Sequence, residues 1–207
     1  MPSPSADDPP LETPTGAVLA GGASRRMGQP KCALRLPDGR LMIEVVAREL
    51  AMVCGQVIVI GAAGQEIAPL NAIPSLGRID DLRPGQGPLG GIEALLASEL
   101  DDRYLVCPCD VPAITAQLLG VLAADCPTPA AVLRIDGETR CCPLPLQISS
   151  AALGPLRELL DGGCRAVYRL LERVETTVIP VRRDWARLLR PLNTPRDYDQ
   201  ILNASAR

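Results

Sequence analysis

Three segments of the sequence combine glycine, proline and charged residues in patterns that suit phosphate and metal chemistry. The first, LAGGASRRMGQPK at positions 19–31, places two adjacent glycines before three cations, Arg25, Arg26 and Lys31. Glycines let the backbone approach a phosphate closely and direct N–H groups at it, and cations add complementary charge. The spacing matches neither the GxxxxGK[ST] pattern of P-loops nor the GxGxxG pattern of dinucleotide-binding folds. The alternative to an anion-binding loop is therefore a glycine turn flanked by solvated arginines. We interpret the segment as an anion-binding loop.

The lysine of this segment supports that interpretation. Lys31 is the only lysine among the 21 basic residues of the chain, and all the others are arginines. A compact ammonium and a planar guanidinium are not interchangeable on a phosphate. The retention of one lysine therefore favours a phosphate-binding role, with chance retention as the alternative.

The second segment, DDLRPGQGPLGG at positions 80–91, precedes a predicted helix and begins with two carboxylates. Carboxylates accept hydrogen bonds from a ribose or a base, and a rigid run of glycine and proline is able to shape a base pocket. The alternative is an ordinary turn, since such residues are common in loops. The sequence alone does not decide between Asp80 and Asp81 as the residue that faces a ligand.

The third segment, CPCDVP at positions 107–112, directly follows an apolar run. Asp110 is flanked by prolines that restrict its direction, which suits a carboxylate that holds Mg²⁺ against phosphate oxygens. The alternative is a carboxylate near the start of a helix, because a helix is expected from Thr115 onwards.

The composition indicates one domain and excludes several classes of protein. The 207 residues are 47% hydrophobic and 22% charged, with a net charge of −3, which argues against a general nucleic-acid binder. Residues 1–15 hold five prolines and three acids, so we expect a disordered leader there and one domain over 16–207. With no convincing membrane span, we expect a cytoplasmic protein.

Two residue types are absent, and cysteine is frequent. Without histidine, mechanisms that need an imidazole are excluded, and without phenylalanine the core must be aliphatic. The eight cysteines show no CxxC spacing, so we expect buried, reduced thiols, with a metal or redox role as the alternative.

Hydrophobic patterns predict alternating strands and helices, hence a mostly parallel sheet covered by helices on both faces. The expected strands are 16–20, 56–60, 104–107, 130–135 and 176–181, and the expected helices are 41–53, 89–100, 115–123, 150–161 and 165–173. Asp136-Gly137 and the prolines near 143 indicate an antiparallel excursion, and Thr194 is expected to cap a final helix beside Pro195 and Asp197. The three segments follow strands that we expect to be neighbours, where ligands bind in open sheets.

These motifs resemble a known family. LAGGASRRMGQPK is similar to the LAGGxSxRMGxxK signature of nucleotidyltransferases with a glycosyltransferase-A-like sheet, the fold of nucleotide-diphospho-sugar transferases. DLRPGQGPLGGI, CPCDVP and LNTPRDYDQI are similar to further signatures of bacterial molybdenum cofactor guanylyltransferases, in the expected order over residues 16–202. The resemblance implies a three-layer α/β/α enzyme that transfers GMP from GTP to the terminal phosphate of molybdopterin and releases pyrophosphate, with Mg²⁺ as cofactor.

The resemblance also implies roles for single residues. Lys31, Arg26 and Asp110 would be catalytic, Asp110 would ligate Mg²⁺, and Asn193 and Arg25 would bind the acceptor. The GTP-binding residues would be Leu19, Ala20, Gly21, Gly22, Lys31, Asp81 and Asp110. Gly21 resembles the guanine-using branch, because pyrimidine-using relatives tend to read LAAG. No protein base is needed, since a phosphate monoester with a second pKa of about 6 is already ionised.

The chain departs from the family pattern at two places. It has Ile60-Gly61-Ala62 where a polar asparagine is frequent, and Pro191 where the first of two asparagines is usual. One alternative is a transferase of the same fold that acts on another phosphorylated acceptor, such as a sugar phosphate or a phospholactate-like acid. A second is a non-catalytic nucleotide-binding protein. The expected partners are GTP, molybdopterin and, transiently, cofactor-biosynthesis proteins and recipient molybdoenzymes, with no nucleic acid and no membrane.

Overall fold

A computed structural model describes residues 13–20, 31–61, 76–124, 126–194 and 196–198. Its strands are β1 Thr15–Leu19, β2 Val57–Ile60, β3 Leu76–Ile79, β4 Arg103–Pro108, β5 Ala130–Ile135, β6 Cys142–Ser149 and β7 Thr176–Val181. Its helices are α1 Met42–Ala51, α2 Pro88–Leu96, α3 Ala116–Ala123, α4 Leu153–Asp161 and α5 Val167–Arg173, with 3₁₀ segments η1 Lys31–Ala33, η3 Ser150–Ala152 and η4 Arg183–Leu189. The alternation predicted from the sequence is confirmed.

The strands form one sheet in the order β3-β2-β1-β4-β6-β5-β7. β1 pairs in parallel with both β2 and β4, whereas β6 runs antiparallel to β4 and β5. The mostly parallel sheet and its antiparallel excursion are therefore confirmed. We expected the three motifs to follow neighbouring strands, and this was wrong in part. β1 and β4 are neighbours. β3, which precedes the second motif, is separated from β1 by β2, because β2 pairs with both.

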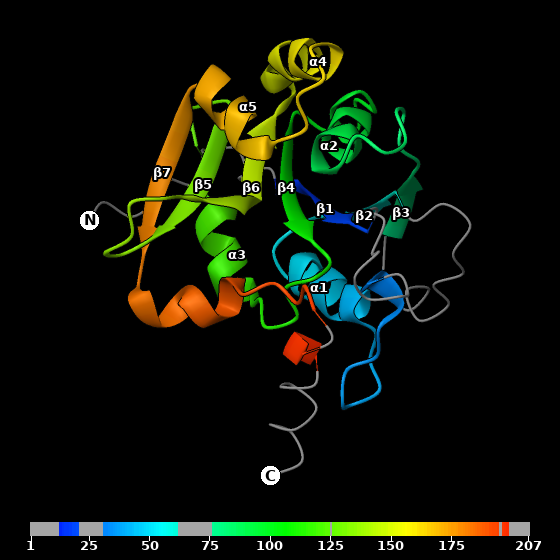
Figure 1. Ribbon diagram of the computed structural model, residues 1–207, viewed down its shortest axis with the longest axis vertical. Coiled ribbons are helices and arrows are strands. Elements are labelled where there is room, and N and C mark those ends of the chain that lie inside the picture. The colour runs from blue at the N-terminus through cyan, green and yellow to red at the C-terminus, as the bar shows by residue number, and fades with distance from the viewer. Residues whose placement is uncertain (1–12, 21–30, 62–75, 125, 195, 199–207) are drawn as a thin grey trace, which may run out of the picture.

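Helices cover the sheet on both faces, as the α/β/α expectation requires (Figure 1). One buried cluster joins α1, α3 and η4 to one face, and a second joins α2, α4 and α5 to the other. Both clusters are mainly aliphatic, and the first also contains the five buried cysteines Cys32, Cys54, Cys107, Cys109 and Cys126. Tyr104 is fully buried, and its hydroxyl accepts a hydrogen bond from the backbone N–H of Asp101 at 2.9 Å. Burial of these side chains is the main stabilising contribution to the fold.

Local signals explain most of the helix ends. Pro88 occupies the first turn of α2, where its missing N–H costs nothing. The helix ends at Leu96, earlier than the expected Leu100, because Glu99 has a positive φ of 53° and Leu100 is exposed. The predicted cap at Thr194 is confirmed: its hydroxyl accepts from the backbone N–H of Asp197 at 3.2 Å.

The sequence did not predict β3 or η4. The four residues of β3 include Gly77 and Arg78, so they show neither alternation nor a continuous apolar run. η4 contains three charged residues among seven, a composition typical of a loop. Across the described ranges, none of the helices has the length and apolarity that crossing a membrane requires.

Candidate active site

The carboxyl ends of the parallel strands are held level by backbone hydrogen bonds that continue beyond the strands. The N–H of Ala20 donates to Ile60 at 2.9 Å, and the N–H of Cys109 donates to Leu19 at 3.1 Å. The segments that follow β1, β2 and β4 therefore start from one edge of the sheet. A ligand site is expected at this edge in an open α/β sheet.

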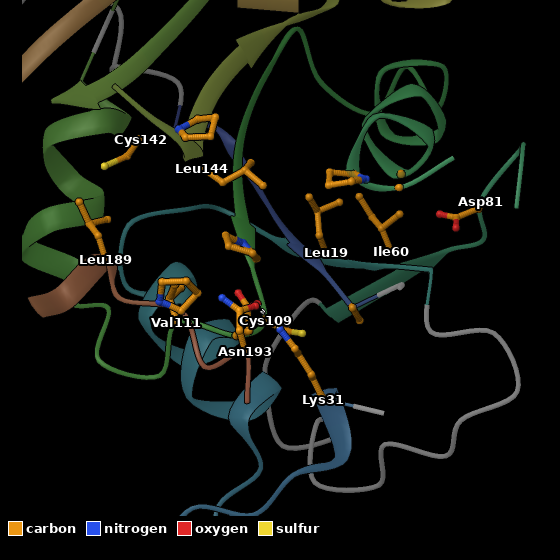
Figure 2. A pocket seen from close by; sticks show the side chains of 18 of the residues that line it. Leu19, Lys31, Ile60, Asp81, Cys109, Val111, Cys142, Leu144, Leu189 and Asn193 are labelled. Atoms are coloured by element: carbon orange, nitrogen blue, oxygen red, sulfur yellow. Dashed lines mark hydrogen bonds and ion pairs between the residues drawn. The ribbon is translucent and has the colours of Figure 1, made fainter. Parts of the chain in front are cut away.

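A cavity of about 800 Å³ lies at this edge, a size that suits a small-molecule substrate (Figure 2). Its lining residues are Leu19, Ala20, Lys31, Ile60, Asp81, Gly85, Gly87, Pro88, Gly91, Pro108, Cys109, Asp110, Val111, Cys141, Cys142, Pro143, Leu144, Leu189, Pro191 and Asn193. Segments from all three motifs and from the LNTP motif thus share one cavity.

Lys31, Asp110 and Asn193 meet in this cavity. The Lys31 ammonium lies 2.7 Å from Asp110 Oδ2 and also donates to Asn193 Oδ1 at 2.8 Å. In Figure 2 the Lys31 side chain extends toward Cys109 and Asn193. The side chains of Lys31 and Asp110 are 19% and 18% exposed, so both remain accessible to a ligand from the cavity. The ammonium, carboxylate and amide come from positions 31, 110 and 193, which are far apart in the sequence.

Asp110 does not cap the helix that follows it, because another residue takes that position. Thr115 is the N-cap of α3, its hydroxyl accepts from the N–H of Leu118, and Glu49 accepts from the N–H of Ala116 at 2.6 Å. The structure therefore rules out the alternative that Asp110 is a helix-start carboxylate.

Asn193 is held by a set of hydrogen bonds in the segment before the final helix. The N–H of Leu192 donates to the carbonyl of Asp110 at 2.7 Å, so this segment lies directly against the end of β4. The Asp197 carboxylate accepts from the N–H groups of Asn193 and Thr194 at 3.2 and 2.9 Å. The Thr194 hydroxyl and these backbone N–H groups lower the pKa of Asp197. The ionised Asp197 thus fixes the backbone that carries Asn193.

Asp81 lies in the loop after β3 and lines the cavity, whereas Asp80 is exposed and does not line it. Figure 2 shows the Asp81 carboxylate directed toward the side of the cavity formed by Leu19 and Ile60. Burial, and to a lesser degree the charge of Asp80, raises the pKa of Asp81. The sequence did not decide which of Asp80 and Asp81 faces a ligand, and Asp81 is the one that lines the cavity. It is a partly desolvated carboxyl group able to accept hydrogen bonds.

A glycine keeps this part of the cavity open. A Cβ added at Gly91 would lie 2.9 Å from Leu19 Cδ2 and 3.1 Å from Ile60 Cγ2, and 3.5 Å from Asp81 Oδ1. A side chain at this position would push both lining residues out of place. Gly91 of the second motif therefore serves close packing of α2 on β1 and β2.

We expect Asp81→Asn to stabilise the fold at neutral pH. An acid with a raised pKa is less favourably ionised in the folded protein than in the unfolded chain. The penalty is present above the raised pKa and disappears as the pH falls through it toward the ordinary value of about 4. Asparagine has the same shape without the charge. Urea unfolding at several pH values should show an excess free energy of unfolding at pH 7 that shrinks toward pH 4.

The control for this prediction is Asp136→Asn, at an exposed carboxyl in the turn between β5 and β6. It removes the same charge from a solvated position and should leave the free energy of unfolding nearly unchanged. If the Asp81 variant were less stable than the wild type at pH 7, the desolvation argument would be wrong.

The end of the cavity away from Asp81 is apolar, and it was not predicted from the sequence. Cys142, Leu144 and Leu189 lie on the opposite side of Leu19 from Asp81 in Figure 2. The pKa of Cys142 is raised, mainly by burial and further by Glu138, so its thiol is neutral at pH 7. The prolines near position 143 were the one available signal, and from the sequence they were interpreted as part of an antiparallel excursion.

The structure describes the position of six of the ten predicted site residues. It brings Leu19, Ala20, Lys31, Asp81, Asp110 and Asn193 into one cavity. Gly21, Gly22, Arg25 and Arg26 lie outside the described residues. All eight cysteines are free thiols, five of them buried, as expected for small apolar side chains. No cluster of three or more histidine, cysteine or carboxylate side chains suited to a metal occurs among the described residues.

Comparisons with known proteins agree with this geometry. The family described as "MobA-like NTP transferase domain" matches residues 16–177. The chain is 34% identical to a probable molybdenum cofactor guanylyltransferase of Deinococcus radiodurans, over 90% of this chain and 93% of the relative. A similar protein of Rhodopirellula baltica with the same name is 30% identical, over 94% and 92%.

A solved structure shows the same fold. Molybdopterin-guanine dinucleotide biosynthesis protein A of Archaeoglobus fulgidus superimposes with a TM-score of 0.75, at 23% identity, over 93% of this chain and 98% of that one. The expected nucleotidyltransferase fold is thus confirmed. With the family match covering most of the chain, the protein belongs to the MobA-like NTP transferase family and is a nucleotidyltransferase.

Proposed function

We propose that this protein transfers GMP from GTP to the terminal phosphate of molybdopterin, forming molybdopterin guanine dinucleotide and pyrophosphate. The observation that carries the proposal is the meeting of Lys31, Asp110 and Asn193 in one cavity, with Lys31 2.7 Å from Asp110. The names of the Deinococcus and Rhodopirellula relatives support a guanylyl group as the group transferred and the molybdenum cofactor as its acceptor.

The guanosine is assigned to the end of the cavity that contains Asp81. An ionised carboxylate there accepts hydrogen bonds from N1–H and the 2-amino group of guanine, donors that adenine and cytosine do not offer together. The backbone of Leu19, Ala20, Gly21 and Gly22 would contact the nucleotide. Gly85, Gly87 and Gly91 line this end of the cavity, which leaves room for a purine.

The phosphates are assigned to Lys31 and Arg26, and a Mg²⁺ ion to Asp110. Mg²⁺ in such sites is held by one or two carboxylates together with substrate phosphates, so the Asp110 carboxylate and the Asn193 amide oxygen fit it as protein donors. When bound, the ion neutralises charge on the phosphates. Lys31 contributes a further positive charge where pyrophosphate leaves.

The acceptor is assigned to the apolar end of the cavity, with Asn193 and Arg25 near its phosphate. Cys142, Leu144 and Leu189 offer neutral, polarisable surface for an uncharged ring system. An oxygen of the acceptor phosphate forms a bond to the α-phosphorus of GTP as the bond to pyrophosphate breaks. Because that oxygen is ionised at pH 7, holding the two anions together is the main task of the protein.

The proposal is tested by pyrophosphate release from purified protein with Mg²⁺. Release is expected with GTP and molybdopterin together, at least about tenfold faster than with ATP or CTP. Equal rates with CTP would refute the assignment of the base. A faster rate with a sugar phosphate or a phospholactate-like acid would refute the acceptor, and nucleotide binding without turnover would refute catalysis.

The cellular context follows from the same proposal. Molybdopterin and its dinucleotide would be handed on by transient contacts with cofactor-biosynthesis proteins and recipient molybdoenzymes. We expect the reaction to take place in the cytoplasm, where GTP is available.

A further inference from the structure

The loop of residues 80–87 forms the wall of the cavity beside Asp81 and connects β3 to α2. Its backbone includes two glycines with positive φ, Gly85 at 80° and Gly87 at 66°. Such residues make a sharp turn possible but do not hold it in one conformation, because glycine loses much conformational freedom on folding. Contacts from outside the loop must therefore fix the position of Asp81.

Arg83 provides the first of these contacts. Its Nε lies 3.0 Å from Glu93 Oε2 on α2, and its Nη1 donates to the Asp161 carboxylate at the end of α4. The Glu93 side chain is 2% exposed, and its other oxygen accepts from Arg157 Nε of α4 at 3.3 Å. Among the described residues, Oε2 has no hydrogen-bond partner. The Arg83 charge is thus the neighbour that compensates this oxygen.

A second contact joins the loop to the segment between α4 and α5. Arg165 Nε donates to Gln86 Oε1 at 2.8 Å. The backbone of this segment is also near the loop, since a Cβ added at Gly87 would lie 3.8 Å from the Arg165 carbonyl. Side chains of α2, α4 and the α4–α5 segment therefore hold the loop, and none of the three residues that make these contacts, Glu93, Asp161 and Arg165, lines the cavity.

Asp81 and Arg83 point in different directions from the same loop. The carboxylate of Asp81 lines the cavity, whereas the guanidinium of Arg83 reaches α2 and α4. Burial and the charge of Asp80 raise the pKa of Asp81, whereas the ion pairs of Arg83 are with Glu93 and Asp161. Arg83 consequently acts on the loop and not directly on the carboxyl group.

We propose that Arg83 is a positioning residue for guanine recognition, which acts by tying the Asp81 loop to Glu93 of α2 and Asp161 of α4. This inference rests on the proposed function, because it assumes that Asp81 receives the guanine. A loop that moves by a fraction of an ångström loses the alignment of its hydrogen bonds with the base. Lys31 and Asp110 stand on other elements, and the ion pairs of Arg83 within the described ranges are with Glu93 and Asp161, so the chemical step should be spared.

The main test variant is Arg83→Met, which keeps the apolar stem and removes the charge. We expect the KM for GTP to rise at least about tenfold while kcat stays within about twofold of the wild type. Because an uncompensated Glu93 could impair folding, the double variant Arg83→Met/Glu93→Gln removes the buried charge as well. It should fold and show the same rise in KM.

Two further variants separate positioning from stability. Arg83→Lys retains one charge but not the planar fork that serves Glu93 and Asp161 together, so its KM should lie between those of Arg83→Met and the wild type. Arg173→Met removes an ion pair of the same length as that of Arg83 with Asp161, between α5 and Glu158 of α4, with neither partner in the loop. It should leave the KM for GTP unchanged.

The inference is wrong if the double variant keeps the wild-type KM and loses only thermal stability, or if Arg173→Met raises KM equally. Its failure can be distinguished from failure of the proposed function. Calorimetric titration with GTP and Mg²⁺, without acceptor, measures the affinity for the nucleotide directly. A wild type that binds GTP but transfers nothing to molybdopterin would refute the function, while weaker GTP binding by Arg83→Met would still support the positioning role.

Discussion

Asp110→Asn is expected to lower kcat for GMP transfer at least about 100-fold, which is about 2.7 kcal/mol of transition-state stabilisation. The substitution keeps the shape of the side chain and removes the charge that Lys31 contacts at 2.7 Å. An amide oxygen is a much weaker ligand for Mg²⁺ than a carboxylate. Steady-state kinetics as a function of Mg²⁺ concentration should show a lower maximum and a half-maximal concentration shifted upward.

The variant is expected to remain folded, because asparagine keeps the shape of Asp110 and the Lys31 ammonium still has the Asn193 amide oxygen as a partner at 2.8 Å. Circular dichroism and the thermal midpoint check this point. Asp136→Asn, which removes an exposed carboxyl that does not line the cavity, should be fully active. Wild-type kcat with an unshifted Mg²⁺ dependence in Asp110→Asn would remove the mechanism proposed above.

Lys31→Ala is expected to have an effect of the same size for a different reason. The ammonium is the one cation among the described residues that line the cavity. Its loss removes positive charge from the place where pyrophosphate develops, and a single such donor is typically worth 100- to 1,000-fold, or about 3–4 kcal/mol. We therefore expect kcat to fall at least about 100-fold, measured by pyrophosphate release at saturating GTP.

Lys31→Arg tests whether charge alone is sufficient. A guanidinium is larger and forked, and the ammonium of Lys31 already contacts Asp110 and Asn193 together. We expect the arginine variant to stay at least about tenfold below the wild type. Arg40→Ala, which breaks the exposed pair with Asp38 outside the cavity, is the matched control and should be fully active. Full activity of Lys31→Arg would mean that this lysine is retained by chance.

The fold and the central pair were predictable from the sequence for a physical reason. Apolar runs bounded by glycine and proline mark buried parallel strands, and parallel strands bring their carboxyl ends to one edge. Lys31 follows β1 and Asp110 follows β4, which are neighbours in the sheet. The position of Asp81 relative to them required the structure, because β2 lies between β1 and β3.

The apolar end of the cavity and the Arg83 contacts were not predictable in this way. Cys142 and Leu144 belong to the antiparallel strand β6, and Leu189 belongs to a charged 3₁₀ segment, so their meeting depends on sheet order and not on periodicity. The partners of Arg83 lie 10 and 78 positions further along the chain. In a chain with many arginines and carboxylates, composition does not select such pairs.

The contact between Leu192 and the end of β4 has a consequence for protein synthesis. The backbone N–H that donates to Asp110 belongs to Leu192, and the amide oxygen that accepts a hydrogen bond from Lys31 belongs to Asn193. Both residues are translated long after the three motifs at positions 19–31, 80–91 and 107–112. A nascent chain still attached to the ribosome is able to fold much of its sheet before these residues emerge from the exit tunnel. Until Asn193 has packed against the end of β4, such a chain lacks the amide oxygen that accepts a hydrogen bond from Lys31 in the completed cavity.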